Sequence, residues 1–208
     1  MNIAIVGNGR MGRTLDAVCA RRDDVRVIGH VGRGGCESLD ALDGLDAALD
    51  FSAPENLPML LSGAVRRRIP LIIGTTGMSG AQGEAIRAAS RRIPIVWSEN
   101  FSVGVTVLVR LARLAAQALG REFDMEIVET HHNRKVDAPS GTAKLILRQI
   151  DPEGLYAPVY GRSGRIGARG REIFAQGALR AAAFARKAEP GLYDMEDVLF
   201  GGDGWTRS

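Results

Sequence analysis

Short apolar runs alternate with segments of helical periodicity through the first part of the chain. Five runs have the length and composition of strands, at residues 2–7, 25–31, 45–51, 70–73 and 93–97. Between them, apolar residues recur at helical spacing over residues 10–21, 54–67 and 80–91. The connection after Val31 leaves room for little more than one turn, around residues 37–42. Because parallel neighbours need a crossover connection, this alternation predicts an α/β fold built on a parallel sheet.

The pattern changes after Phe101, where helical segments are separated by longer turn-rich sequence. The predicted elements are a helix over 103–119, a strand over 124–130, and helices over 142–150 and 174–187. Pro190 and Gly191 are expected to stop the last helix. Residues 152–171 are rich in Gly, Arg and Pro and hold few candidate strands. We therefore expect a second, smaller and truncated α+β domain.

Composition and charge exclude several classes of protein. Apolar residues make up 45% and charged residues 25%, which is typical of globular domains. Apolar runs stay below the roughly 20 residues that span a bilayer, and the start lacks a charged leader, so we expect no membrane span or signal peptide. Cys19 and Cys36 have no Cys or His beside them, so we expect them to be reduced, in a cytoplasmic protein. The net charge of +3 comes from scattered arginines, which suits an anionic small molecule better than nucleic acid.

Residues 7–12, Gly-Asn-Gly-Arg-Met-Gly, match G-x-G-x-x-G directly after the first predicted strand. Glycines there permit a tight turn and close approach of the backbone to a pyrophosphate, and the helix that follows directs its N–H groups at the phosphates. This context predicts a Rossmann-type, doubly wound sheet that binds a dinucleotide. A tight turn with no ligand is the alternative.

The second predicted strand ends without the acidic residue that binds the ribose hydroxyls of NAD. Gly32 and Arg33 stand at that position, while Asp23 and Asp24 precede the strand. An arginine can pair with a 2′-phosphate, so the sequence favours NADPH, with NADH possible. Arg33 as an ordinary surface arginine is the other interpretation.

A segment rich in titratable groups, residues 129–142, begins at the end of the strand predicted in the second domain. It contains His131, His132 and Lys135, which offer proton donors and positive charge. Ser140 is a good helix N-cap, and the free N–H groups behind it form a site for a carboxylate. Two adjacent histidines without a cysteine or a histidine four residues on are poorly spaced for zinc.

Residues 129–143 read Glu-Thr-His-His-Asn-Arg-Lys-Val-Asp-Ala-Pro-Ser-Gly-Thr-Ala. This run, with several shorter segments, resembles the dihydrodipicolinate reductase family. The family signature E-x-H-H-x-x-K-x-D-A-P-S-G-T-A is reproduced over residues 129–143. Further similar segments are GNGRMG at 7, DFS at 50, GTTG at 74, NFSVGV at 100, FAQGALRAA at 174 and PGLYDMEDVL at 190. The resemblance covers nearly the whole chain in the right order.

The resemblance implies reduction of 4-hydroxy-tetrahydrodipicolinate to tetrahydrodipicolinate by NAD(P)H, with loss of water, in lysine and diaminopimelate biosynthesis. His131 matches the acid–base histidine of the family, and Lys135 its proton donor. The residues implied to bind the cofactor are Gly7, Asn8, Gly9, Arg10, Met11, Gly12, Arg33, Gly74, Thr75, Thr76, Ser98, Glu99, Asn100 and Phe101. The residues implied to bind the substrate carboxylates are His132, Lys135, Gly141 and Thr142.

The same resemblance implies two domains and shows where the chain departs from the family. Residues 1–102 with 174–208 would bind the dinucleotide, and residues 103–173 the substrate. Most strands that family members place before the final helix are missing, and in the family they build the sheet between subunits. We therefore expect a monomer or homodimer instead of the family's tetramer. A non-catalytic nucleotide-binding descendant and a dehydrogenase for amino or keto acids are the competing functions.

Overall fold

The structure is a computed structural model that describes residues 1–32, 35–36, 38–120, 125–131, 139–154 and 172–201. The chain divides into two compact units. Unit 1 comprises Met1–Val103 and Arg171–Ser208, and unit 2 comprises Gly104–Gly170. Among the described residues, every helix is too short or too polar to span a bilayer.

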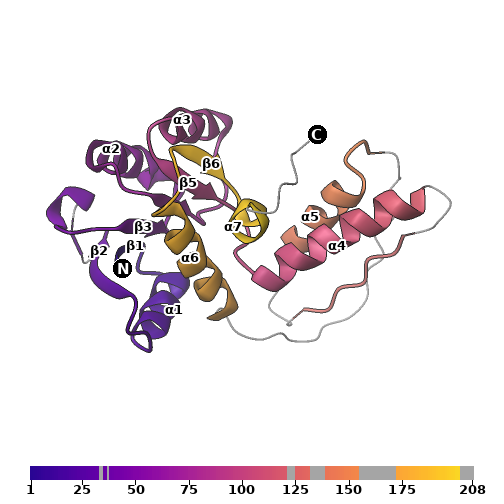
Figure 1. Ribbon diagram of the computed structural model, residues 1–208, viewed down its shortest axis with the longest axis horizontal. Helices are drawn as coiled ribbons and strands as arrows, with labels where there is room; N and C mark the ends of the chain where they lie inside the picture. The colour runs from indigo at the N-terminus through magenta and orange to yellow at the C-terminus, as the bar shows by residue number, and fades with distance from the viewer. Residues whose placement is uncertain (33–34, 37, 121–124, 132–138, 155–171, 202–208) are drawn as a thin grey trace. The chain divides into compact units, whose positions relative to one another are not determined.

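Unit 1 is built on a six-stranded parallel sheet (Figure 1). Its strands are β1 (Asn2–Val6), β2 (Arg26–Val31), β3 (Ala47–Asp50), β4 (Leu71–Ile73), β5 (Pro94–Trp97) and β6 (Gly191–Tyr193). Their order across the sheet is β2-β1-β3-β4-β5-β6, and every neighbouring pair is parallel. The chain reverses its direction of winding between β1 and β3, which is the switch point where such sheets bind ligands. The predicted Rossmann-type doubly wound sheet is confirmed.

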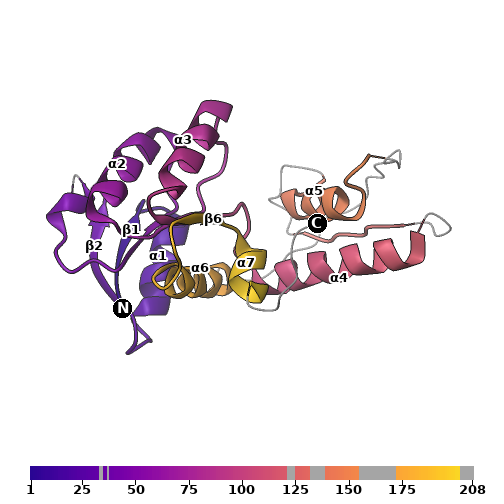
Figure 2. The ribbon, with the colours of Figure 1, turned by 45° about the horizontal axis from the view of Figure 1, so that its top comes forward.

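Helices cover both faces of this sheet (Figure 2). One face carries α1 (Arg10–Cys19) and α6 (Glu172–Ala185), and the other carries α2 (Leu57–Arg67) and α3 (Gly80–Ser90). Two single turns, η1 (Leu39–Ala41) and η2 (Pro54–Asn56), complete the connections.

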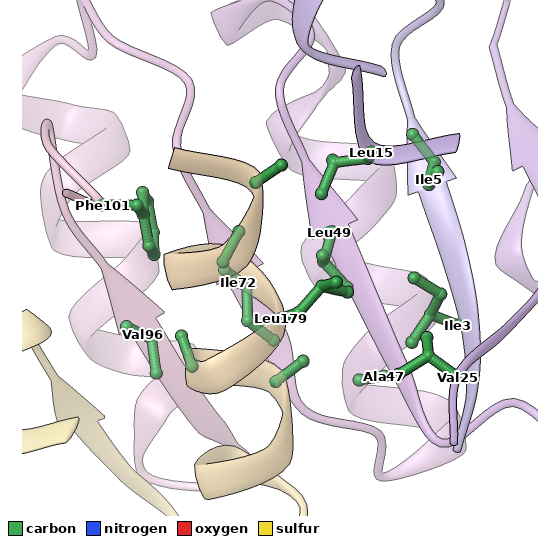
Figure 3. Close-up of a cluster of buried hydrophobic side chains, with 14 of the residues drawn as sticks. Ile3, Ile5, Leu15, Val25, Ala47, Leu49, Ile72, Val96, Phe101 and Leu179 are labelled. Atoms are coloured by element: carbon green, nitrogen blue, oxygen red, sulfur yellow. The ribbon is translucent and has the colours of Figure 1, made fainter. Parts of the chain in front are cut away.

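The core of unit 1 follows from the alternation of side chains along each strand. On β1, Ile3 and Ile5 pack under α1 and α6, whereas Ala4 and Val6 belong to the opposite cluster. Both faces are therefore apolar, which is why the strands appear in the sequence as continuous apolar runs. Figure 3 shows the cluster on the face covered by α1 and α6. Its labelled residues are Ile3, Ile5, Leu15, Val25, Ala47, Leu49, Ile72, Val96, Phe101 and Leu179.

The C-terminal segment of unit 1 contains two elements that the apolar pattern did not predict. Strand β6 pairs with β5 at the edge of the sheet, and α7 (Met195–Phe200) follows it. Asp194 begins α7 with a capping box, because its side chain accepts from the Asp197 N–H and the Asp197 side chain accepts from the Asp194 N–H. Pro190 and Gly191 therefore lead into a strand and a short helix.

Unit 2 contains helix α4 (Val103–Leu119), apart from its first residue, and helix α5 (Gly141–Ile150). The strand predicted over 124–130 is wrong for the described part of that range, because residues 125–130 are in no strand. A strand needs a neighbour for its N–H and C=O groups, and no described residue of unit 2 is in a strand. The apolar residues Met125, Ile127 and Val128 are accordingly exposed.

Candidate active site

The glycine-rich turn at the end of β1 is tight against the neighbouring loop. Gly7 has a φ of 94°, and a Cβ there would lie 2.7 Å from the carbonyl oxygen of Phe51. A Cβ on Gly12 would lie 2.2 Å from the carbonyl oxygen of Gly7. A Cβ on Gly9, by contrast, would have no atom within 4 Å, so this glycine leaves its space open. The turn places the start of α1 at the switch point, between β1 and β3.

The start of α1 has the features of an anion site. Gly9 is its N-cap and makes no side-chain capping bond, and the first turn contains no acidic residue. The first N–H groups and the positive end of this ten-residue helix are therefore available to a phosphate. Asn8 and Arg10 are exposed at the turn, and Met11 packs on the core. This geometry fits a dinucleotide pyrophosphate.

A buried polar cluster joins the carboxyl ends of β3 and β4. Asp50 is fully buried, and its carboxylate accepts from the Ser52 N–H (3.1 Å), the Ser52 hydroxyl (2.5 Å) and the Thr75 hydroxyl (2.9 Å). Burial raises the pKa of Asp50, although the bonds from Ser52 and Thr75 oppose the shift. The Thr75 hydroxyl also accepts from the Ser52 N–H at 2.9 Å. Thr75 thus holds two strand ends together from a buried position.

Aromatic packing fixes the loops that follow β4 and β5. A Cβ on Gly74 would lie 2.1 Å from the Phe51 ring, so only glycine fits without a shift of that ring. Phe51 contacts Phe101 edge to face, with ring centroids 5.6 Å apart. Ser98 donates its hydroxyl to the Asn100 carbonyl at 2.8 Å and accepts from the Asn100 N–H. The side chains of Thr76 and Glu99 are exposed. The two segments predicted to line the nicotinamide follow β4 and β5. These strands are parallel neighbours, so both segments begin at the carboxyl ends of the strands.

Three predicted site residues, Arg33, His132 and Lys135, lie outside the described residues. Gly32, beside Arg33, has a φ of 112°, and a Cβ there would have no atom within 4 Å. It directly follows β2 and lies next to the glycine turn, because the Gly7 N–H donates to the carbonyl of the preceding residue, Val31, at 3.2 Å.

In unit 2, one carboxylate links the predicted acid–base histidine to the start of α5. His131 Nε2 lies 2.7 Å from Glu129 Oε2, and the Ser140 N–H donates to Glu129 Oε1 at 2.8 Å. The Ser140 hydroxyl donates to Glu129 Oε2 as well. Partial burial raises the pKa of Glu129, but the bonds from His131 and Ser140 outweigh burial and lower the pKa to about 2.

The start of α5 is a second candidate anion site. Ser140 caps the helix as predicted, and its hydroxyl accepts from the Ala143 N–H at 2.9 Å. Gly141 is exposed, and a Cβ on it would have no atom within 4 Å. Thr142 follows in the first turn and is partly exposed. The described residues contain no cluster of three His, Cys, Asp or Glu side chains that could hold a metal ion.

Glu129 was not among the predicted site residues. Its main partner, Ser140, stands eleven residues later, so spacing within one helix or strand could not relate them. The available signal was a carboxylate two residues before a candidate catalytic histidine.

Comparison with known proteins identifies the family of this chain. Residues 1–101 match the model of the dihydrodipicolinate reductase N-terminus, and residues 104–170 match that of its C-terminus. The chain belongs to the dihydrodipicolinate reductase family. The 4-hydroxy-tetrahydrodipicolinate reductase of Pseudoalteromonas atlantica is 34% identical, over 95% of this chain and 98% of the relative. That of Akkermansia muciniphila is 36% identical, over 96% of this chain and 98% of the relative.

A solved structure shares the fold of this family member. It is a dipicolinate-bound dihydrodipicolinate reductase from Paenisporosarcina sp. TG-14, with a TM-score of 0.73 and 18% identity. The match covers 93% of this chain and 97% of that one. The alignment with the Pseudoalteromonas relative spans 261 positions, more than the 208 residues of this chain. The relative therefore has residues with no counterpart here, as expected for a shortened member.

Proposed function

We propose that this chain reduces 4-hydroxy-tetrahydrodipicolinate to tetrahydrodipicolinate, with loss of water, in lysine and diaminopimelate biosynthesis. The chain is a pyridine-nucleotide-dependent oxidoreductase by family. The observation that carries the proposal is His131, held by Glu129 next to the capped start of α5. That arrangement supplies a proton donor and a carboxylate site within one short segment. The cytoplasm is the compartment that suits this reaction and the two free cysteines.

On the cofactor side, the glycine turn and the start of α1 would hold the pyrophosphate. Gly74, Thr75 and Thr76 would line the nicotinamide from the end of β4, and Ser98, Glu99, Asn100 and Phe101 from the end of β5. When bound, the reduced nicotinamide supplies the hydride. The buried Asp50–Thr75 bond keeps the loop after β4 in place.

NADPH is the preferred cofactor in this proposal, and NADH a weaker one. The argument rests on Gly32 and Arg33 at the end of β2. Gly32 offers no carboxylate to a ribose 2′-hydroxyl, and the Arg33 guanidinium can pair with a 2′-phosphate.

On the substrate side, His132, Lys135 and the N–H groups of Gly141 and Thr142 would bind the two carboxylates. A helix N-terminus favours an anion by roughly 0.3–1 kcal/mol when exposed and by up to about 2 kcal/mol when partly buried. His131 would then donate the proton that the ring needs after hydride addition. Lys135, charged at neutral pH, would assist departure of the 4-hydroxyl group as water.

For assembly we propose a monomer or homodimer. A tetramer formed by merging sheets needs open strand edges, and the described residues of unit 2 contain no strand. Light scattering over a range of concentrations, with and without NADPH, measures the mass directly. A stable tetramer of 22.3 kDa chains at low micromolar concentration would contradict this proposal.

The test of function is NADPH oxidation coupled to a synthase that supplies fresh substrate. We expect oxidation that requires both the synthase and this chain, and that His131→Gln nearly abolishes. If the folded wild type binds NADPH but leaves it unoxidised, the chain is a nucleotide-binding descendant without this activity. Oxidation with amino or keto acids alone would indicate the other class of dehydrogenase.

A further inference from the structure

We infer that Glu129 is a positioning residue that keeps a proton on His131 Nε2, so that His131 exchanges its catalytic proton through Nδ1. The inference rests on the proposed role of His131 in the reaction. It concerns the atom of the ring that does the chemistry and the residue that selects this atom. Neither follows from the family signature, which gives only residue types.

The geometry directs one ring nitrogen at one carboxylate oxygen. His131 Nε2 and Glu129 Oε2 are 2.7 Å apart, the distance of a short charge-assisted hydrogen bond. Both side chains are partly covered, with 33% of His131 and 28% of Glu129 exposed. Within the described part of the chain, Glu129 is the side chain that forms a hydrogen bond or ion pair with a ring nitrogen of His131.

The charge state of Glu129 decides which atom carries the hydrogen. With a pKa of about 2, Glu129 is ionised at neutral pH and can only accept hydrogen bonds. Nε2 must therefore be the donor. Neutral His131 is then the Nε2–H tautomer with a lone pair on Nδ1, and protonated His131 carries hydrogens on both nitrogens.

This assignment defines the proton transfer. The imidazolium loses its Nδ1 proton, which forms a C–H bond with the enamine carbon left by hydride addition. The N–H electron pair stays on Nδ1, and Nε2 keeps its proton in the bond to Glu129. The negative charge of Glu129 stabilises the imidazolium before the transfer, and the neutral ring remains correctly oriented afterwards.

The same carboxylate also organises the predicted carboxylate site. Glu129 accepts both the N–H and the hydroxyl of Ser140, while the Ser140 hydroxyl accepts from the Ala143 N–H. A continuous chain of bonds thus runs from the first turn of α5 through Ser140 and Glu129 to His131. Glu129 fixes the acid–base group relative to the helix end that would hold the substrate.

The experiment measures imidazole ¹⁵N shifts in the full-length protein above the pH at which its histidines lose their charge. The chain has three histidines, and His131→Gln identifies the signals of His131 by their loss. We expect the Nε2–H tautomer in the wild type. Predominance of the Nδ1–H tautomer in folded wild type would overturn the inference, and this measurement needs no variant of Glu129.

Two variants separate positioning of His131 from capping of α5. Glu129→Gln removes the charge but keeps an oxygen that can accept from Ser140. We expect kcat to fall about 10–100-fold, the range found when a residue that orients a metal-ligating histidine is replaced, with KM changed by less than about threefold. In this variant His131 should also no longer be found only as the Nε2–H tautomer. Ser140→Ala keeps the His131–Glu129 bond and should raise KM while the tautomer persists.

Unchanged kcat and tautomer in Glu129→Gln would overturn the inference and reduce Glu129 to a cap for α5. The tautomer is read without substrate, so its result does not depend on the proposed reaction. A wild type that shows the Nε2–H tautomer but no reductase activity would refute the proposed function while leaving the proton assignment supported.

Discussion

The two units bury their apolar residues to very different extents. In unit 1, β3 and β4 are buried along their whole length, and helices cover both faces of the sheet. In unit 2, the 17-residue helix α4 has one buried residue, Val109, while Leu108 and Leu111 are 52% and 58% exposed. Helix α5 likewise buries only Ala143.

This difference indicates how the candidate residues of each unit are held in place. In unit 1, the residues proposed to bind the cofactor are fixed by packing, because backbone and rings approach each other too closely for any side chain at Gly12 or Gly74. In unit 2, the residues proposed for acid–base chemistry are fixed by a few polar bonds around Glu129. Substitutions that alter packing should therefore have the larger effects in unit 1, where they change the free energy of unfolding. Substitutions that alter charge should have the larger effects in unit 2, where they change turnover.

The largest expected effect is chemical and belongs to unit 2. His131→Gln and Lys135→Ala should each lower kcat by roughly 10²–10⁴-fold, the usual range for a positioned acid or base. NADPH affinity should stay within about twofold of wild type, because unit 1 contains the proposed cofactor site. His30→Gln is the control, since it removes a histidine paired with Asp16 at 3.1 Å in unit 1. Near-normal turnover of both unit 2 variants would refute their roles.

The next effect is one of packing and belongs to unit 1. A Cβ on Gly177 in α6 would lie 1.8 Å from the carbonyl oxygen of Phe101, a backbone atom that cannot rotate away. Gly177→Ala should therefore cost about 3 kcal/mol of unfolding free energy, at the upper end for overpacking. Gly80→Ala, with no atom within 4 Å, should change it by less than about 0.5 kcal/mol. Denaturant unfolding compares the two, and equal stabilities would contradict the close contact.

A smaller effect concerns cofactor choice. Arg33→Ala should weaken NADPH by about tenfold and leave NADH nearly unchanged, because only the 2′-phosphate loses a charge partner. Titration of both cofactors against wild type and variant measures the ratio of the dissociation constants of NADH and NADPH. If this ratio is the same in the two proteins, Arg33 is an ordinary surface arginine.

The smallest effect is on how the free energy of unfolding changes with pH. One carboxyl group in each unit contributes to it, and the two contributions have opposite signs. The pKa of Glu129 is lowered to about 2, so its stabilising contribution is present above about 4.5 and is lost as the pH falls toward 2. The pKa of Asp50 is raised, so the folded state binds its proton more readily and this residue favours folding as the pH falls. Urea unfolding of wild type and Glu129→Gln should differ most near neutral pH. A difference that grows in acid would contradict the assignment.

The sequence was sufficient where local pattern determines structure. Apolar runs predicted β1 to β5, and Ser140 predicted the start of α5 to within one residue. Strand β6 has only three residues and forms by pairing with the open edge of β5. Pairing with a segment so far away in the sequence cannot be predicted from a local pattern. Helix α7 could have been found from the capping box of Asp194 and Asp197.

Two predictions for unit 2 failed because they depend on contacts between separate segments of the chain: a strand was wrongly predicted, and Glu129 was missed. The apolar residues of 125–130 have the composition of a strand, but composition does not supply the neighbour that a strand requires. Glu129 was missed because its importance comes from contacts with His131 and Ser140 together. Sequence patterns report secondary structure and motifs well, whereas bonds between separate segments depend on the fold.

The most direct test of the proposed reduction is a transfer experiment with NADPH that carries deuterium at the transferable position of its nicotinamide. Freshly formed substrate, the labelled cofactor and this chain are combined, and the tetrahydrodipicolinate product is analysed by mass spectrometry and NMR. The account predicts one deuterium at ring carbon 4 of the product, formed roughly 10²–10⁴-fold more slowly when His131→Gln replaces the wild type under the same conditions. Unlabelled product, or label retained entirely in the cofactor, would contradict it.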